Sequence, residues 1–413
     1  MDVLKGACIF GQSGGPTSVI NASAAGVFQE ALAQDCITGV YVAAHGIKGL
    51  LDDVIYDVSK EDPNELNYLL TTPSSAFGSV RYKLKHFDED ETDYEKILNV
   101  FKKYNIRYFF YNGGNDSMDT CSKISSYLTG KGYECRVIGV PKTIDNDLWG
   151  TDHCPGYGSA AKYLATSIME VHQDSRVYDS GMAIIFEVMG RNAGWLTAAT
   201  SLASYKGMGP DLIYLPELDF DIEEFTADVD RIYSSTGHIM VAVSEGIKNS
   251  KGVYFAEMTT PELSTDSFGH VQLGGAAGYL ANYLKSKFNS MKIRAIEFSL
   301  LQRCAAHCAS RTDIDEAYMT GKMAVKYALE GNSGYMVAFE REHDPDYLCR
   351  TKLVDLADVA NKEKKVPMEW INVKEHGMNS QFIDYVKPLI VGETVFPTED
   401  GLPRFARIKR VRA

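Results

Sequence analysis

One short stretch of the chain carries the densest group of side chains that could do chemistry. It reads Pro141-Lys142-Thr143-Ile144-Asp145-Asn146-Asp147, with two carboxylates two residues apart and a lysine before them. Phosphoryl transfer needs such a set: one carboxylate to accept a proton, another to bind a divalent ion, and a cation to neutralise the moving phosphate. Taken alone, an acidic loop of this kind is more often an ordinary polar turn. Three further loops of matching chemistry decide against that simpler interpretation.

The element before this stretch would place it where open sheets bind their ligands. The apolar run at residues 137–140 predicts a buried strand that ends directly before it. In an open parallel sheet, ligands bind outside the carboxyl ends of the strands. We therefore expect the two carboxylates and the lysine to lie at a ligand-binding edge.

A glycine-rich loop follows another predicted strand, at residues 6–10. Residues 11–17 read Gly-Gln-Ser-Gly-Gly-Pro-Thr, and the apolar spacing from Ile20 to Ala31 predicts a helix after them. A strand, a glycine loop and a helix N-terminus together can form a backbone anion site. The loop is neither a Walker A motif nor a dinucleotide fingerprint. A tight structural turn would explain its glycines about as well.

Other predicted strands also end in polar loops. Small residues at 71–80 would let the backbone approach a ligand, with Arg81 supplying charge; an ordinary loop before a surface arginine is the alternative. The strand at 108–111 runs into the glycines at 113–114. Strands predicted at residues 182–188, 239–243 and 293–298 lead to loops at 189–195, 244–246 and 301–303.

The composition of the whole chain limits the binding partners and the cellular compartment that we expect. The 413 residues are 45% hydrophobic and 23% charged, with a net charge of −13, which argues against nucleic acid or an anionic membrane as partner. The eight cysteines are scattered without a disulfide framework, which suits a reducing cytosol. The first residues do not resemble a signal peptide, and no stretch is apolar enough to span a bilayer. We expect a cytoplasmic protein.

Strand and helix patterns alternate along most of the chain. This alternation predicts a doubly wound α/β fold, and the length allows two lobes. The last clear strand is predicted at residues 335–339. From Tyr347 onwards the tail is charged, and we expect it to be irregular.

Taken together, these motifs resemble the phosphofructokinase family, and more closely its pyrophosphate-dependent branch. The similarity covers roughly residues 6 to 340, with the motifs in the family's order and spacing. The residues that carry it are Gly14-Gly15, residues 78–81, 113–117, 141–147 and 187–191, Glu245-Gly246 and residues 301–303.

The resemblance implies a fold, a reaction and partners. It implies two doubly wound lobes with mostly parallel sheets and an active site in the cleft between them. The donor lobe would comprise residues 1–148 with roughly 315–345 returning to it, the sugar-phosphate lobe residues 149–314, and a C-terminal extension residues 346–413. The family phosphorylates the 1-hydroxyl of fructose 6-phosphate with Mg²⁺, and with pyrophosphate as donor the reaction is reversible. We expect a homo-oligomer, a dimer or a tetramer.

The resemblance also implies roles for single residues. Asp145 matches the general base, and Asp147 and Asp116 are assigned to the metal site. Lys142 and Arg81 would disperse charge on the phosphoryl oxygens. The matches to positions that hold the sugar phosphate are Thr143, Met189, Gly190, Arg191, Glu245 and Arg303, and Gly14 matches a position at the transferred phosphate.

Two positions indicate the phosphoryl donor. ATP-using relatives carry Gly-Gly-Asp-Gly-Ser where this chain has Asn115 and Asp116 after two glycines, and they carry glycine at the position of Lys142. Asp116 would put negative charge where a nucleotide α-phosphate passes. Lys142 would supply the cation that a free phosphate leaving group needs. Both residues favour pyrophosphate over ATP.

Three positions depart from the family pattern. Asn115 replaces an Asp that is common to both donor types. Residues 269–275 imitate the family's His-x-Gln-Arg-Gly-Gly motif but carry Leu273 in place of the arginine, so Arg303 is the better match. Met182 stands where many members send an arginine into a neighbouring subunit's site. The competing interpretations are an ATP-using phosphofructokinase and a non-catalytic regulatory subunit that binds sugar phosphate, although the intact base argues against the second.

Overall fold

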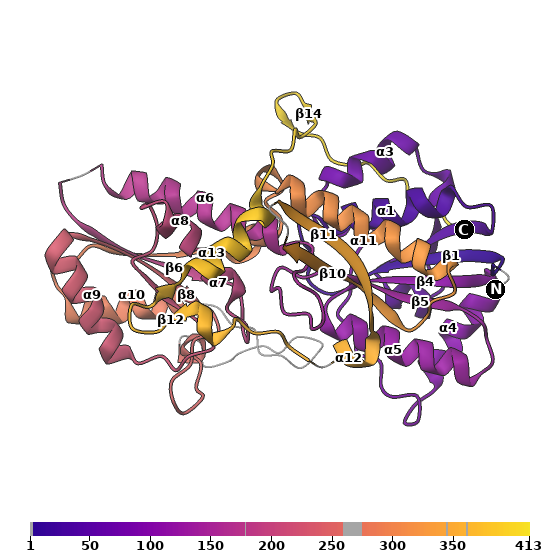
Figure 1. Cartoon of the computed structure of the whole chain (residues 1–413), viewed down its shortest axis with the longest axis horizontal. Coiled ribbons are helices and arrows are strands. Elements are labelled where there is room, and N and C mark those ends of the chain that lie inside the picture. Colours follow the sequence, from indigo (N-terminus) through magenta and orange to yellow (C-terminus); the bar gives the residue numbers. More distant parts are fainter. Residues whose placement is uncertain (1–2, 178, 259–274, 344–345, 361) are drawn as a thin grey trace.

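The computed structural model describes the whole chain except residues 1–2, 178, 259–274, 344–345 and 361 (Figure 1). Two layered α/β lobes lie side by side along the long axis of the molecule (Figure 1). One is built on a seven-stranded sheet and the other on a four-stranded sheet. These two sheets position the loops of the candidate site.

The larger sheet has a parallel centre and antiparallel edges. Its strand order is β11-β10-β5-β4-β1-β2-β3. The five strands from β10 to β2 run parallel, while β11 and β3 pair antiparallel at the two edges. The strands are β1 (Gly6–Gln12), β2 (Ile37–Ala43), β3 (Ile55–Asp57), β4 (Ile106–Gly113), β5 (Arg136–Pro141), β10 (Tyr335–His343) and β11 (Tyr347–Asp355).

Helices cover both faces of this sheet, which is why its central strands are mostly apolar. Helices α1 (Ile20–Leu32) and α11 (Arg311–Leu329) lie on one face, and α4 (Thr92–Lys103) and α5 (Asn115–Gly130) on the other (Figure 1). Successive side chains of a strand point to opposite faces. In β4, for example, Phe110 packs in the same cluster as α1, and Phe109 in the same cluster as α4.

The smaller sheet is parallel throughout. Its order is β7-β8-β6-β9, with β6 (Met182–Val188), β7 (Leu212–Tyr214), β8 (His238–Ser244) and β9 (Ile293–Glu297). One face packs on α6 (Tyr157–Ser175), with Phe186 of β6 in the same cluster as Leu164. The other packs on α9 (Ile222–Thr236) and α10 (Ala276–Lys287), with Ile185 in the same cluster as Leu280.

Each sheet has a point at which the strand order reverses. In the larger sheet the chain moves from β1 to β2 on one side and later to β4 and β5 on the other. In the smaller sheet it moves from β6 to β7 and β8, and then to β9 on the opposite side. The carboxyl ends of strands at such reversals form ligand-binding crevices. The predicted fold class, doubly wound and mostly parallel, is confirmed.

The prediction that the tail after Tyr347 is irregular was wrong. Residues 347–355 form β11, which pairs with β10 over its full length. The exposure of β11 explains the miss, because none of its residues is buried and the exposed ones include the apolar Leu348. Further on, α13 (Ser380–Val386) places Phe382 and Val386 in the core beneath the smaller sheet.

The remaining elements are short. They are α2 (Ile47–Leu51), α3 (Pro63–Tyr68), α7 (Trp195–Ala199), α8 (Ser201–Tyr205), α12 (Leu356–Val359), β12 (Ile371–Asn372), β13 (Gly377–Met378), β14 (Thr398–Glu399), β15 (Leu402–Pro403), and the 3₁₀ turns η1 (Val58–Lys60), η2 (Leu69–Thr71), η3 (Phe255–Met258), η4 (Ser299–Arg303), η5 (Ala306–Cys308), η6 (Met368–Trp370) and η7 (Lys387–Ile390). No described helix is long and apolar enough to cross a membrane.

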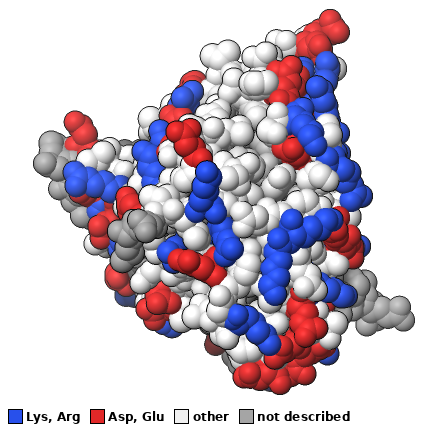
Figure 2. Space-filling model, turned by 90° about the vertical axis from the view of Figure 1, so that its right-hand side faces the viewer, with Lys and Arg blue, Asp and Glu red and all other residues white. Residues whose placement is uncertain are grey.

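Surface charge is mixed at the end of the molecule that carries the chain termini. Basic and acidic side chains are interspersed there with uncharged ones (Figure 2). The net charge of −13 is therefore not gathered into a face of one sign on this side.

Candidate active site

The loops that follow β1, β4 and β5 are bonded to one another at the carboxyl edge of the larger sheet. The Ser13 amide donates to the Asn112 carbonyl at 2.9 Å, and the Lys142 amide donates to the Gly113 carbonyl at 3.1 Å. The hydroxyl of Ser79 donates to the Gly14 carbonyl at 2.7 Å. Three of the loops predicted to carry chemistry, and the loop before Arg81, are thus joined into one surface.

Three cations converge on the glycine loop after β1. The buried Nζ of Lys142 donates to the Gly15 carbonyl at 2.5 Å. A Cβ atom built on Gly15 would lie 3.1 Å from Nη1 of Arg303 and 3.9 Å from Nη2 of Arg81. Gly14 has a φ of +74°, a conformation that glycine adopts without strain. A glycine backbone flanked by an ammonium and two guanidinium groups suits a polyanion such as a phosphate chain.

These cations influence one another. Burial, together with the positive charges of Arg81 and Arg303, lowers the pKa of Lys142 to about 8, against the opposing effect of Asp145. Burial and Arg81 likewise lower the pKa of Arg303. A multiply charged anion would relieve this repulsion, so the electrostatics and the geometry indicate the same kind of ligand.

Asp145 lies close enough to these cations for their charges to act on its carboxyl group. Its amide donates to Oγ1 of Thr143 at 3.1 Å. Burial raises the pKa of the Asp145 carboxyl, while the positive charge of Lys142 opposes the shift. A general base is most effective when its pKa is near the working pH. Asp145 is therefore a buried carboxyl group beside the cation cluster, and its role as the base stays a prediction.

Asp147 and the start of α5 offer oxygen ligands for a cation. Nδ2 of Asn115 donates to Oδ2 of Asp147 at 3.3 Å, while the buried Oδ1 of Asn115 has no hydrogen-bond partner. Burial, Asp145 and Glu363 raise the pKa of Asp147 to about 7. Asp116 follows Asn115 in the first turn of α5. An orphaned amide oxygen beside a carboxylate fits a hard cation such as Mg²⁺.

The predicted metal ligands do not form a closed protein cage. Within the described residues, the compact groups of three ligand-type side chains lie elsewhere, and Asp116, Asp145 and Asp147 are in none of them. Mg²⁺ sites in phosphoryl-transfer enzymes commonly use one or two carboxylates together with phosphate oxygens and water. The open arrangement around Asp147 is of that type.

The smaller lobe brings a second set of predicted residues to the same junction. The Gly190 amide donates to Oε1 of Glu245 at 3.3 Å, and the Met189 amide donates to Oε1 of Gln302 at 3.2 Å. Burial, with a smaller contribution from the charge of Asp145, raises the pKa of Glu245 to about 7. The carboxyl groups of the two lobes therefore interact electrostatically across the junction.

Two arginines accompany Glu245. Arg303 ends the turn η4 that follows β9, and it lies beside the glycine loop of the other lobe. Arg191 follows β6, and its charge acts on Glu245. Each arginine can grip a phosphate with two parallel hydrogen bonds. The segment at residues 269–275, which imitates a family motif, lies outside the described residues except for Gly275.

Sequence reasoning missed three residues at this junction. Gln302 fixes the Met189 amide. Asn146 is fully buried, with its side chain bonded to protein atoms on both sides. Lys364 donates its amide to the Asp147 carbonyl at 2.8 Å and its Nζ to the Asp152 carbonyl at 2.7 Å. Asn146 sits inside the central motif, which was a usable signal, whereas nothing in the charged tail marked Lys364.

Comparisons with known proteins show the family of the chain. The profile of the family described as Phosphofructokinase matches residues 8–296. The chain is 43% identical to the pyrophosphate–fructose 6-phosphate 1-phosphotransferase of Halomonas elongata, over 98% of this chain and 96% of that one. A relative of the same name from Methylococcus capsulatus is also 43% identical, over 97% and 96%. The crystal structure of a pyrophosphate-dependent phosphofructokinase from Marinobacter aquaeolei matches with a TM-score of 0.89 at 40% identity, covering 99% of this chain and 97% of that one.

Proposed function

This chain belongs to the phosphofructokinase family, and from that premise we propose that it transfers a phosphoryl group from pyrophosphate to fructose 6-phosphate. The products are fructose 1,6-bisphosphate and inorganic phosphate, and the reaction is reversible. One observation carries the proposal beyond the family likeness. The cations of Lys142, Arg81 and Arg303 converge on the glycine loop, with the Asp145 carboxylate in their field.

Asp145 starts the reaction by accepting a proton. The 1-hydroxyl of the sugar gives its proton to a carboxylate oxygen of Asp145 while the hydroxyl oxygen attacks the nearer phosphorus of pyrophosphate. The bond from that phosphorus to the bridging oxygen breaks, and its electron pair leaves with inorganic phosphate. Lys142 and Arg81 neutralise the charge that develops on the phosphoryl and leaving oxygens. In the reverse direction Asp145 returns the proton.

Residues of both lobes hold the sugar phosphate. Arg191 and Arg303 bind its phosphate group, and Glu245 accepts hydrogen bonds from its hydroxyls. The backbone at Met189 and Gly190 lines the same site, together with Thr143 beside the base. The charge of Asp145 helps to raise the pKa of Glu245, which supports placing the sugar near both carboxyl groups.

A divalent ion, Mg²⁺, completes the site. Asp147 and Asp116 are its proposed protein ligands, and the orphaned Oδ1 of Asn115 is available to a metal-bound water or to the ion itself. When bound, Mg²⁺ supplies positive charge to the phosphate oxygens. The replacement of the family's Asp by Asn115 thus keeps an oxygen at the site while removing one negative charge.

The donor preference rests on two side chains. Lys142 is buried against the glycine loop, where it can hold a phosphate that has no nucleoside attached. Asp116 stands in the first turn of α5, where it would repel a nucleotide's α-phosphate. No observation favours ATP as donor or a non-catalytic role.

We also propose the lobe boundaries, the compartment and the oligomeric state of the enzyme. The donor lobe comprises residues 1–148 with roughly 315–345, the sugar-phosphate lobe residues 149–314, and the extension residues 346–413. The protein acts in the cytoplasm as a homo-oligomer.

The proposal is tested by incubating the purified protein with Mg²⁺, pyrophosphate and fructose 6-phosphate. Phosphorus NMR should show conversion of pyrophosphate to phosphate and appearance of a second sugar phosphate resonance. Fructose 1,6-bisphosphate plus phosphate should regenerate pyrophosphate. Hydrolysis of pyrophosphate without a new sugar phosphate, or no turnover in either direction, would overturn the proposal.

A further inference from the structure

Asn146 sits between the two carboxylates of the catalytic loop and is held in an unusual conformation. Its φ is +55°, which is uncommon outside glycine and persists only where the surroundings enforce it. The side chain is wholly buried and bonded at both ends. Nδ2 donates to the hydroxyl of Tyr385 at 2.9 Å, and Oδ1 accepts from the Cys154 amide at 2.9 Å. Asp145 and Asp147 flank this turn in the sequence.

The partner of Asn146 comes from a distant part of the chain. Tyr385 lies on α13, 239 positions further on and beyond the segment 8–296 that the family profile matches. Its hydroxyl also donates to the Asp152 carbonyl at 2.8 Å. One phenolic hydroxyl therefore ties the turn between the carboxylates to the segment that leads into α6.

Tyr385 is itself immobilised. The guanidinium of Arg341 lies 4.6 Å from the centre of the Tyr385 ring, and Nη1 of Arg341 donates to the Tyr385 carbonyl at 2.9 Å. The rings of Trp195 and Trp370 pack at 5.4 Å and 5.2 Å from it. Only 8% of the residue is exposed. Fixed in this way, the hydroxyl can hold Asn146 at a defined place.

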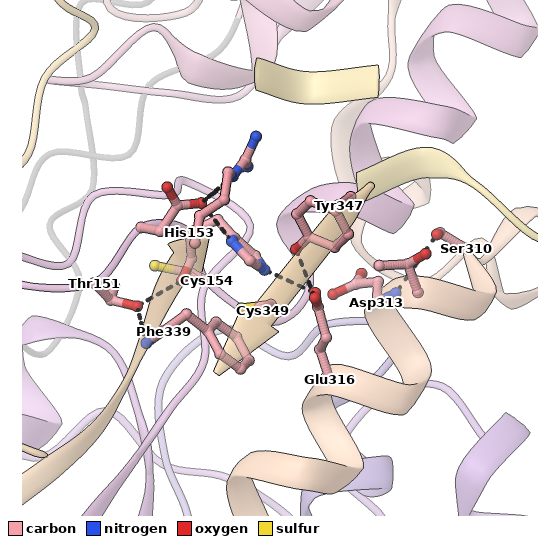
Figure 3. A network of polar contacts seen from close by, with 12 residues as sticks. Thr151, His153, Cys154, Ser310, Asp313, Glu316, Phe339, Tyr347 and Cys349 are labelled. Atoms are coloured by element: carbon pink, nitrogen blue, oxygen red, sulfur yellow. Dashed lines mark hydrogen bonds and ion pairs between the residues drawn. The ribbon is translucent and has the colours of Figure 1, made fainter. Parts of the chain in front are cut away.

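A polar network anchors Arg341 in turn. Arg341 pairs with Asp152 at 2.9 Å, and Asp152 bonds Nδ1 of His153 at 2.8 Å. Nε2 of His153 bonds Glu316 on α11 at 2.7 Å, and Glu316 accepts from the Tyr347 hydroxyl at 2.6 Å (Figure 3). The support for Tyr385 thus extends into α11 and into the neighbouring strands β10 and β11 of the larger sheet.

The side chains of His153, Glu316 and Cys349 are also close enough to suggest a metal site. Both ring nitrogens of His153, however, are hydrogen-bonded to carboxylates, and both Glu316 oxygens are bonded as well. No unpaired ligand atom of His153 or Glu316 is left for an ion. The cluster is better explained as a set of ion pairs and hydrogen bonds that hold Arg341, and through it Tyr385, in place.

We propose that Tyr385 is a positioning residue for the reaction, acting through Asn146 to set the directions of Asp145 and Asp147. It touches neither substrate nor the reacting atoms. Small displacements of a catalytic group are enough to lower turnover strongly. Loss of the hydroxyl would free the Asn146 amide and allow the strained turn to relax. The inference rests on the proposed function for the identity of the reaction whose turnover is measured.

Four variants test the proposal: Tyr385→Phe, Asn146→Gly, the double variant, and Tyr157→Phe as a control. Tyr157 is likewise buried, and its hydroxyl donates to the Trp195 carbonyl at 3.2 Å rather than to Asn146. Glycine at 146 tolerates the positive φ without the side chain. Tyr385→Phe should lower kcat roughly 10- to 100-fold, with KM for fructose 6-phosphate within about threefold of the parent. The control should keep the parent's kcat at a similar unfolding temperature.

The double variant separates positioning from general weakening. If Tyr385 acts through Asn146, adding Tyr385→Phe to Asn146→Gly should lower kcat by less than about twofold more. Amide hydrogen exchange over residues 142–154 should increase in Tyr385→Phe and not in the control, whatever the donor. Parental kcat and exchange in Tyr385→Phe, or a full additional loss in the double variant, would overturn the proposal. If the parent uses only ATP, the proposed function fails, and the same variants assayed with ATP still test Tyr385.

Discussion

Replacing Lys142 by methionine removes one charge from the anion site and keeps nearly the same side-chain length. The ammonium lies 2.5 Å from the Gly15 carbonyl, so a phosphate on the glycine loop would be within its reach. Methionine should fit the buried site without opening a cavity. Loss of one preorganised group that stabilises developing charge lowers turnover about 10²- to 10³-fold, or about 2.7–4 kcal/mol. We expect a loss of that size with pyrophosphate.

The same lysine should limit activity at alkaline pH. Burial and the neighbouring guanidinium groups lower its pKa to about 8. A lowered pKa means that the ammonium is lost at a lower pH, so about nine in ten molecules carry the charge at pH 7 and about one in ten at pH 9. Because kcat/KM reports the free enzyme, its value for pyrophosphate should fall as pH rises through about 8.

Three proteins assayed from pH 6 to 10 test this reasoning, with product measured by a stopped assay so that coupling enzymes do not impose their own pH limits. The parent should show the alkaline decline. Lys142→Met should be slow at every pH and lack it, and Lys142→Arg should shift it to higher pH because a guanidinium stays protonated. A methionine variant that keeps the parent's rate, or the same decline near pH 8, would refute the assignment.

Three further predictions address the base, the sugar site and the buried network. Asp145→Asn should lower kcat about 10²- to 10⁴-fold with a much smaller change in KM for fructose 6-phosphate; kinetics within a few-fold of the parent would rule out Asp145 as the base. Arg303→Ala should weaken fructose 6-phosphate binding by about 1.5–3 kcal/mol in a calorimetric titration, while Arg294→Ala, exposed on β9, should bind normally; equal affinities would place the sugar phosphate elsewhere. Burial lowers the pKa of His153, but Glu316 and Asp152 outweigh this effect and raise the pKa to about 9. Protonated His153 therefore stabilises the folded protein fully below about pH 6.5, and this stabilisation is lost as pH rises through about 9. His153→Gln should flatten the decline of the unfolding temperature between those pH values, and an unchanged decline would contradict this.

Most of the strands and the loops at their ends could be predicted from the sequence. Apolar runs such as residues 137–140 and 182–188 form strands wherever both faces are covered, and glycines mark where they end. The order of strands within a sheet is not local information. The glycine loop after β1 lies beside Lys142 and Arg303 because of how the sheets and lobes pack. Local sequence patterns do not show this packing, although the family resemblance implied a common site.

The missed features depend on contacts between distant segments. The strand β11 has no buried residue and no apolar run, so its sequence resembles a solvated tail. The contact of Tyr385 with Asn146 joins residues 239 positions apart, and an isolated tyrosine on a short helix gives no signal of it. Lys364 is one of many charged residues in its segment, and only packing distinguishes it. Residues that support a site from outside its motifs carry little pattern of their own.

The central claim is that this protein uses pyrophosphate as its phosphoryl donor. The most direct test is kcat/KM for pyrophosphate and for ATP on the unmodified protein, at saturating fructose 6-phosphate and the same free Mg²⁺ concentration. The burial of Lys142 against the glycine loop and the position of Asp116 at the start of α5 predict high activity with pyrophosphate and little with ATP. A preference for ATP would show that Asp116 does not obstruct the nucleotide and would contradict the account of the donor site.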